Sequence, residues 1–319
     1  MKSKMNNGFI VFSIIAVIIL LSPKEILAQK TNEISLKPKN YTIWVKVNTE
    51  TLKGQLIDLK EQSIIIRDYT RSIENPLLFV MDNVVGTCNL LNYARKYLPY
   101  LEKFINFGTD EVFGSAIDGI DFKEYDRYNS RSPYSASKAG AEELCVAYEN
   151  TYGMPIYCTH TMNVFGERQL PEKFIGIAMR KILAGESVTI HCDEETGTKS
   201  GLRHWVHAAD VADATIFIVD LPHKKFKLAS DAGIATCPKF NIVGQYEISN
   251  LEVAQKIAAI LGKELKYAMV GYDLQRPGHD FRYSLSGEYM KELGWEPKYD
   301  FDLRLKQMIE WTLKNDRWL

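Results

Sequence analysis

The feature that most constrains the fold is the alternation of short apolar segments with longer amphipathic ones after about residue 72. Apolar runs of strand length lie at 103–108, 156–161 and 187–191. Helical periodicity is found at 74–97, 134–152, 171–183, 251–261, 288–293 and 303–314. Strands that alternate with helices at this spacing form a parallel sheet covered on both faces. We therefore expect an α/β fold.

Composition narrows the class of protein. A chain of 319 residues suits one large α/β domain with a smaller piece. The net charge of −1 gives no basic footprint, so we expect no nucleic-acid partner. The five cysteines include no C-x-x-C pair. This argues against a disulfide framework or a zinc ribbon and indicates no metal site.

The N-terminal segment is typical of a secretory signal. Lys2 and Lys4 precede the apolar run Phe9–Leu21, and Ala28 follows as a small residue at a cleavage position. The run is shorter than the roughly 20 residues that span a bilayer. We expect residues 1–28 to be a signal-like segment, with an uncleaved anchor or a plain buried segment as alternatives. Membrane contact is expected only through residues 9–21, and only if they are retained.

Residues 29–71 form a separate unit in this interpretation. Apolar and polar positions alternate at 41–47 and 55–59, and an apolar run follows at 64–66. We expect a small antiparallel β unit. Three short strands are barely enough to be stable alone unless they pack on something. The unit has no readable chemistry, and a packing or interaction module is the simplest interpretation.

Tyr134 and Lys138 are the first candidates for chemistry. They lie four residues apart on an expected helix, so their side chains share one face. A neighbouring ammonium favours the phenolate and lowers the pKa of the tyrosine. Such a phenolate can take a proton from a hydroxyl group while hydride leaves the same carbon for a nicotinamide. The pattern alone is weak, because about one chance match is expected in a chain this rich in tyrosine and lysine.

Thr109, Asp110 and Glu111 directly follow the apolar strand at 103–108. In a parallel α/β sheet, ligands bind at the carboxyl ends of the strands. Two adjacent carboxyl groups can act as an acid and a base if their surroundings separate their pKa values. The alternative is structural, since Thr-Asp-Glu is also a common helix-capping sequence.

Seven motifs in order carry a resemblance to a known family. They are Thr109-Asp-Glu-Val-Phe-Gly114, Ser132-Pro-Tyr-Ser-Ala-Ser-Lys138, Asn163-Val-Phe-Gly166, Pro171-Glu-Lys-Phe-Ile175, Arg203-His-Trp205, Arg276-Pro-Gly-His-Asp280 and Glu292-Leu-Gly-Trp295. Together they resemble the nucleotide-sugar 4,6-dehydratases, extended short-chain dehydrogenase/reductases of the dTDP-glucose 4,6-dehydratase type. The resemblance covers roughly residues 72–319.

The resemblance implies a Rossmann-like sheet, NAD as cofactor and a nucleotide-diphosphate sugar as substrate. By position, Tyr134 with Lys138 and Thr109 would remove the C4 hydroxyl proton while NAD takes the C4 hydride. Glu111 would take the C5 proton, and Asp110 would protonate the departing C6 hydroxyl. Tyr134 and Lys138 also match the positions that bind the cofactor.

Further positions match the substrate site of that family. Asn163, Glu172 and Lys173 correspond to residues that line it, and Arg203 and Arg276 to arginines that face the phosphates. Arginine suits a diphosphate because its fork donates two hydrogen bonds at once. The substrate-binding part would lie mainly at 163–319. The resemblance also implies a homodimer, formed through the helices at 77–97 and 134–152.

Four positions depart from the usual pattern of the family. It usually has arginine near His160, a second asparagine at Val164, tyrosine at Phe113 and an acidic residue at His204. These departures leave the chemical roles in place and leave the nucleotide and sugar preference open.

The glycine-rich turn of the family has no counterpart before Ile73. Family members place a G-x-x-G-x-x-G turn at a helix N-terminus that faces the pyrophosphate. Gly8 and Gly54 are the only glycines between Met1 and Ile73. We therefore expect an incomplete Rossmann-like sheet, a truncated dehydratase-like domain over 72–319 and impaired binding of NAD.

Two other functions remain open at this point. One is a non-catalytic exported or membrane-tethered fusion protein, because the N-terminus indicates export or anchoring whereas a dehydratase is expected in the cytoplasm. The other is a related nucleotide-sugar epimerase or decarboxylase. Thr109-Asp110-Glu111 favours dehydration over epimerisation, since an epimerase needs no acid–base pair for eliminating water.

Overall fold

The structure is a computed structural model that describes residues 75–193, 196–222, 237–271 and 281–319, together with five short strands outside these ranges. The strands are β1 Val17–Leu21, β2 Thr42–Val47, β3 Glu50–Gln55, β4 Leu101–Phe107, β5 Ile156–Thr161, β6 Asn163–Phe165, β7 Val188–Cys192, β8 Leu202–His207, β9 Leu228–Ser230, β10 Gly233–Ala235, β11 Lys239–Ile242, β12 Glu247–Ser249 and β13 Tyr267–Gly271. The helices are α3 Pro76–Phe79, the π-helical η1 Val80–Val85, α4 Gly86–Tyr97, the 3-10 turn η2 Asp110–Val112, α5 Pro133–Tyr152, α6 Phe174–Leu183, α7 Ala208–Asp220, α8 Asn250–Leu261, α10 Glu288–Leu293, α11 Phe301–Leu313 and the 3-10 turn η3 Asp316–Trp318.

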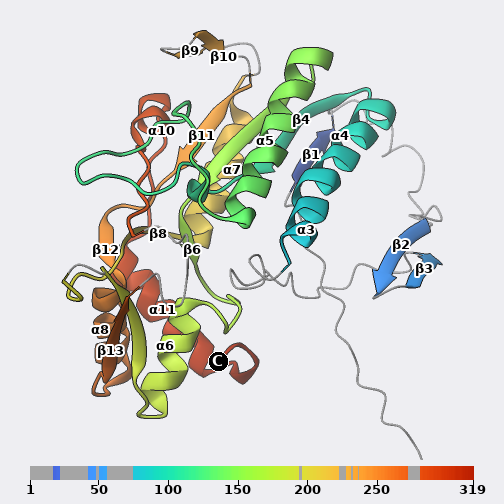
Figure 1. The fold of residues 1–319 in the computed structure, drawn as a ribbon. Helices are drawn as coiled ribbons and strands as arrows, with labels where there is room; N and C mark the ends of the chain where they lie inside the picture. Colours follow the sequence, from blue (N-terminus) through green and yellow to red (C-terminus); the bar gives the residue numbers. More distant parts are fainter. Residues whose placement is uncertain are drawn as a thin grey trace, which may run out of the picture.

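The main sheet has the order β1-β4-β5-β11. Strands β4, β5 and β11 are parallel to one another, and β1 pairs antiparallel with β4, with Val17 opposite Asn106. Helices α4 and α5 cover one face, and α7 and α10 cover the other (Figure 1). The predicted α/β fold with a Rossmann-like parallel sheet is confirmed.

Strand β4 shows why the sheet strands are nearly continuous apolar runs. Phe104 packs with Leu91 of α4 and Cys145 of α5 on one face. Its neighbour Ile105 packs with Ile218 of α7 on the other face. Successive side chains point to opposite faces of a strand, so a sheet with helices on both sides buries both sets.

A second core belongs to the C-terminal part of the chain. Helices α6, α8 and α11 pack around the parallel pair β7–β13 (Figure 1), and the side chains at its centre include Met179, Ile190, Ile257 and Leu305. The small sheet β12-β8-β6 contributes Phe165 and Trp205 to the same core. Strands β6 and β8 also begin near the candidate site residues Asn163 and Arg203.

Most of the helices and strands predicted after residue 72 are present, although several begin or end at other residues than predicted. Some elements of the structure had no predicted counterpart. The predicted helix 74–97 is three consecutive helical pieces, α3, η1 and α4. Helix α6 begins at Phe174 rather than Pro171, because Lys173 has the extended backbone of a cap residue. Strands β8 and β11 and helix α7 were not predicted. The end of α7 depends on a distant partner, since the Lys103 ammonium donates to the carbonyl of Ile218 at 3.0 Å.

In the N-terminal region, β2 and β3 form an antiparallel hairpin with Thr42 opposite Gln55. Strand β3 therefore begins earlier than the predicted strand at 55–59, and the predicted strand at 64–66 lies outside the described residues. Residues 17–21 of the signal-like segment form β1. In the part of the chain that the structure describes, no helix has the length and apolar character needed to cross a membrane.

Candidate functional site

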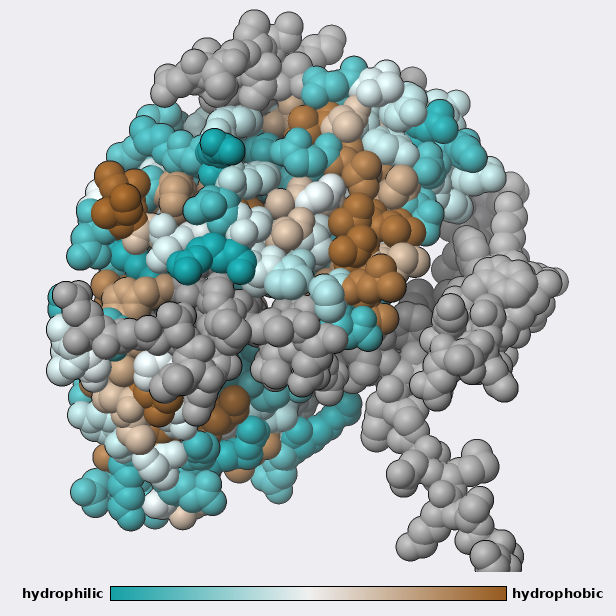
Figure 2. Space-filling model, viewed as in Figure 1, coloured by the Kyte–Doolittle hydropathy of each residue, from teal (hydrophilic) through white to brown (hydrophobic). Residues whose placement is uncertain are grey.

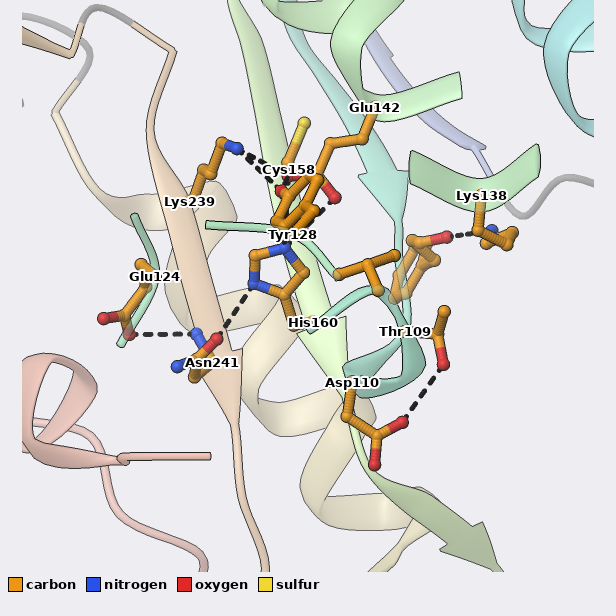
Figure 3. A network of polar contacts seen from close by, with 12 residues as sticks. Thr109, Asp110, Glu124, Tyr128, Lys138, Glu142, Cys158, His160, Lys239 and Asn241 are labelled. Carbon is orange, nitrogen blue, oxygen red and sulfur yellow. Dashed lines mark hydrogen bonds and ion pairs between the residues drawn. The ribbon is translucent and has the colours of Figure 1, made fainter. Parts of the chain in front are cut away.

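The site is centred on the turn that follows β4. Thr109 and Asp110 are buried, and Thr109 caps η2 by accepting a hydrogen bond from the backbone N–H of Glu111 at 3.3 Å. The Thr109 hydroxyl donates to Asp110 Oδ1 at 3.1 Å (Figure 3). Glycine is required just before this turn, because a Cβ on Gly108 would lie 2.5 Å from the carbonyl oxygen of Thr159. The capping interpretation of Thr-Asp-Glu is thus correct, and the cap is made by the hydroxyl of Thr109 and not by a carboxyl group.

Helix α5 brings Tyr134 and Lys138 to this turn. The helix begins with a capping box between Ser132 and Ser135 and with Pro133 in its first turn, as the sequence indicated. This start places Tyr134 where its hydroxyl hydrogen-bonds with Thr109 and lies in the electrostatic field of Glu111 and Asp110. The ring of Phe79 contacts Tyr134 edge-on, with 5.9 Å between the ring centroids.

The electrostatics of Tyr134 differ from the expectation. Burial raises its pKa, the charges of Glu111 and Asp110 raise it further, and the hydrogen bond with Thr109 only partly offsets them. The expected lowering by Lys138 was wrong for the chain alone, because the ammonium of Lys138 donates to the carbonyl of Phe107. Burial lowers the pKa of Lys138, and the negative charge of Glu142 opposes that shift.

Asp110 is a buried carboxyl group that holds its proton more tightly than an exposed aspartic acid does. Burial raises its pKa to about 6, although the hydrogen bond with Thr109 and the charge of Arg203 both act to lower it. Its Oδ2 is buried and has no hydrogen-bond partner among the residues that the structure describes. A buried polar atom without a partner is costly, so this oxygen indicates the place where a ligand group is expected.

Arg203 belongs to β8, and its charge acts on Asp110. It is 2% exposed, donates from Nη1 to the carbonyls of Leu202 and Phe281 at 2.6 Å each, and stacks on Tyr283 with its guanidinium carbon 4.2 Å from the ring centroid. The structure therefore brings Arg203 together with the catalytic candidates, since its charge acts on Asp110.

Three of the other predicted substrate residues, Asn163, Glu172 and Lys173, lie at the start of β6 or just before α6. Asn163 is the first residue of β6 and is partly buried. Glu172 is exposed, and Lys173 is the cap residue of α6. Arg276 lies outside the described residues. Among the residues that are described, no group of three or more His, Cys, Asp or Glu side chains could hold a metal ion.

A buried charged network beneath the turn was missed in the sequence. It joins Glu142 of α5, His160 of β5, Lys239 and Asn241 of β11 and Tyr128 of the loop before α5 (Figure 3). Glu142 is four residues after Lys138, which was the available signal, since that spacing puts both on one helix face. His160 lies in the apolar strand β5, and no residue spacing in the sequence links it to Glu142 or Lys138.

Comparisons with known proteins place the chain among sugar-nucleotide enzymes. The family model described as GDP-mannose 4,6 dehydratase matches residues 67–308. A dTDP-glucose 4,6-dehydratase of Xanthomonas campestris is 34% identical over 264 residues, which are 78% of this chain and 70% of the relative. The dTDP-glucose 4,6-dehydratase 1 of Escherichia coli K12 is 32% identical over 271 residues, with the same shares of each chain.

Solved structures agree with these relatives. A dTDP-glucose 4,6-dehydratase from Streptomyces venezuelae, solved with NAD bound, has a TM-score of 0.67 and 30% identity, and covers 79% of this chain and 72% of its own. A UDP-glucose 4-epimerase from Thermus thermophilus in complex with NAD has a TM-score of 0.67 at 25% identity, with 76% and 74% covered.

Proposed function

We propose that this chain, which belongs to the GDP-mannose 4,6 dehydratase family, dehydrates a nucleotide-diphosphate hexose to its 4-keto-6-deoxy form. The observation that carries the proposal is the convergence of Thr109, Asp110 and Glu111 on the hydroxyl of Tyr134. An epimerase eliminates no water and needs no carboxyl pair beside the tyrosine. The convergence therefore favours dehydration over epimerisation on the same fold.

NAD is the proposed cofactor, and Tyr134 and Lys138 are the described residues that would hold it. Dehydratases and epimerases of similar fold carry NAD in their solved structures. The site suits an oxidised nicotinamide, because the negative charge of Glu111 acts on Tyr134 and favours a positive ring beside it. Bound NAD would accept a hydride from C4 of the sugar and return it at C6.

Each proton then has an assigned carrier in the chain. Tyr134 Oη takes the proton of the C4 hydroxyl once the phenol has released its own proton, and its hydrogen bond with Thr109 orients it. The 4-keto group acidifies the C5 proton, which Glu111 removes and gives back to C5 after water has left and hydride has reached C6. Asp110 gives its proton to the C6 hydroxyl, which leaves as water. Asp110 suits this role because burial raises its pKa to about 6, near the pH at which an acid must hold and release a proton.

The substrate's nucleotide is proposed to lie over the β6–α6 connection, with Asn163, Glu172 and Lys173 as its contacts. Arg203 and Arg276 are proposed to face the diphosphate, whose oxygens accept two hydrogen bonds from one guanidinium. The named relatives act on dTDP-glucose, so this is the first substrate to test.

The activity test uses the full chain with added NAD and dTDP-glucose, UDP-glucose or GDP-mannose, followed by mass spectrometry for loss of one water. We expect product from dTDP-glucose. Glu111→Gln should reduce product roughly 10²–10⁴-fold, and should also abolish incorporation of solvent deuterium at C5, because the base is gone. Glu143→Gln, an exposed change on α5, is the control. Unchanged turnover in Glu111→Gln would remove Glu111 from the mechanism.

A homodimer is proposed to form through the outer face of α3 and η1, which pack beside α5. Five apolar side chains there are 37–65% exposed, namely Leu77, Leu78, Val80, Met81 and Val85. Figure 2 shows apolar residues gathered where α3, α4 and α5 lie in Figure 1. A contiguous apolar patch on a soluble protein commonly marks an interface, and a second copy of the same face would cover it by two-fold symmetry.

The dimer is tested by a charge placed in this patch. Met81→Arg should shift the chain from dimer to monomer in sedimentation equilibrium, raising Kd at least about 100-fold, because burying an unpaired charge costs more than about 3 kcal/mol. Ile216→Arg is the matched control, since Ile216 is a similarly exposed apolar residue on α7. A dimer that persists in Met81→Arg contradicts the proposed interface.

A further inference from the structure

The buried charged network next to the Thr109–Glu111 turn joins one carboxylate to several partners. Glu142 and His160 are fully buried, and Glu142 Oε2 lies 3.1 Å from His160 Nε2. Glu142 Oε1 also accepts from Lys239 Nζ at 2.9 Å and from the hydroxyl of Tyr128. One carboxylate therefore faces two cationic groups from two different strands (Figure 3). The proposed chemistry gives none of these groups a direct role.

Hydrogen-bond accounting assigns the protons of His160. The amide Nδ2 of Asn241 donates to the carbonyls of Phe122 at 3.0 Å and Ser286 at 3.1 Å. Its Oδ1 therefore faces His160 Nδ1 at 2.9 Å and accepts from it. His160 Nε2 faces both oxygens of Glu142 at 3.1 Å and the Tyr128 hydroxyl at 3.1 Å. The single proton of that hydroxyl is donated to Glu142, so Nε2 donates as well. Both ring nitrogens carry protons, and the side chain is an imidazolium.

The surroundings favour that charged state. Burial alone would lower the pKa of His160, but the charge of Glu142 and the hydrogen bonds with Glu142 and Asn241 raise it overall. Glu142 is held as a carboxylate, because His160, Lys239 and Tyr128 outweigh burial and lower its pKa to about 2.

Other charged or titratable groups near the pair come from every adjoining element. They are Tyr128 and Glu124 in the loop before α5, Lys138 and Cys145 on α5, Cys158 on β5, Cys237 just before β11 and Lys239 on β11.

The pair touches both segments that carry the catalytic candidates. Glu142 lies one turn after Lys138 and two turns after Tyr134 on the same face of α5. On the other side, a Cβ built on Gly108 would lie 3.2 Å from Glu142 Oε2 and 3.4 Å from the ring of His160. The end of β4 is held there by the bond from Gly108 N to Thr159 O at 2.6 Å. The ion pair thus fills the space between α5 and the turn.

We propose that the Glu142–His160 ion pair positions Lys138 and the Thr109–Glu111 turn for catalysis, and that only protonated His160 does so. The inference deepens the proposed function and rests on it for the catalytic roles. When His160 is neutral, the positive charge that offsets Glu142 is lost, and one ring nitrogen becomes an acceptor that faces another acceptor, either Glu142 or Asn241 Oδ1. The attraction between His160 and Glu142 weakens, and Lys239 then draws Glu142 away from Gly108. His160 is a positioning residue that acts through Glu142.

The experiment compares two replacements of His160 in the full chain. His160→Arg keeps a positive charge at every pH and can donate two hydrogen bonds to Glu142. His160→Gln keeps a donor but carries no charge. His191→Gln is the control, a histidine in β7 of the other core. The first readout is backbone hydrogen exchange of the peptide that spans 104–113, measured between pH 6 and 9.

In the parent chain, exchange at 104–113, corrected for the intrinsic pH effect, should accelerate at alkaline pH as His160 titrates. His160→Gln should exchange at least 10-fold faster already at pH 6, and His160→Arg should remain protected across the range. The second readout is the pH profile of dehydration. We expect His160→Gln to lower kcat at least 10-fold with KM changed less than 3-fold, and His160→Arg to keep activity to higher pH than the parent.

The outcomes separate the two proposals. If the parent chain makes no product, the proposed function fails, and hydrogen exchange alone still decides the positioning role. If the exchange of 104–113 is the same in His160→Gln and His160→Arg, the positioning role is wrong whatever the activity. Equal pH profiles of the parent and His160→Arg would contradict the requirement for the proton.

Discussion

Tyr134→Phe is expected to lower kcat for dehydration by roughly 10²–10⁴-fold while the fold remains intact. The change removes one oxygen, which is the atom proposed to take the C4 hydroxyl proton. Tyr134 is only partly buried and its ring contact with Phe79 survives in phenylalanine. The loss should therefore appear in kcat, with a small effect on thermal stability. Steady-state kinetics and a thermal melt of the same sample measure both.

The matched control is Tyr152→Phe on the same helix, where the ring is 49% exposed and far from the turn. It should leave kcat within about 2-fold. A Tyr134→Phe enzyme that keeps more than a tenth of parental kcat would point to a different base. At pH values where His160 keeps its proton, the rate of the parent should also rise with pH as the phenol loses its proton in the complex, because burial and the neighbouring carboxyls raise the pKa of Tyr134 in the chain alone.

The parts of the site that could be predicted from the sequence are those set by local chemistry. Ser132, Pro133 and Ser135 mark the start of α5, so the capping signal alone predicts that Tyr134 lies in the first turn. The end of β4 follows from an apolar run that stops at Gly108. These two local signals place the tyrosine in the first turn of α5 and the carboxyl pair directly after β4. The helix and the turn are in contact in the structure.

What could not be predicted depends on contacts between segments far apart in the chain. The pKa of Asp110 is set by burial in the folded chain and partly by the charge of Arg203, which belongs to a different strand. Strand β11 is only four residues long and begins with Lys239, whose charge is neutralised by Glu142 in a different element. A lysine in so short a run is indistinguishable from a loop residue until its partner is known. The lowered pKa expected for Tyr134 failed for the same reason, since the Phe107 carbonyl competes for Lys138.

Asp110→Asn should make the protein more stable above pH 7 while reducing dehydration. Burial raises the pKa of Asp110 from 3.8 to about 6 in the folded chain. A rise of about two units corresponds to about 3 kcal/mol, which is the cost of keeping the ionised carboxyl buried. The amide carries no charge at any pH, and its oxygen can still accept from the Thr109 hydroxyl as Asp110 Oδ1 does. The variant loses the proton donor for the C6 hydroxyl.

The sign of the pH effect follows from proton uptake. Between pH 4 and 6 the folded parent holds a proton on Asp110 that the unfolded chain has released, so the parent loses stability as pH rises and reaches its full penalty above pH 6. Urea unfolding should show equal stability of Asp110→Asn and the parent at pH 4, and a gain of up to about 3 kcal/mol for the variant at pH 8. Asp118→Asn, an exposed change in the same loop, should give no such difference. A gain that is the same at pH 4 and pH 8 would show that Asp110 carries no buried charge. The carboxyl would then lack the property that suits it to release a proton near neutrality.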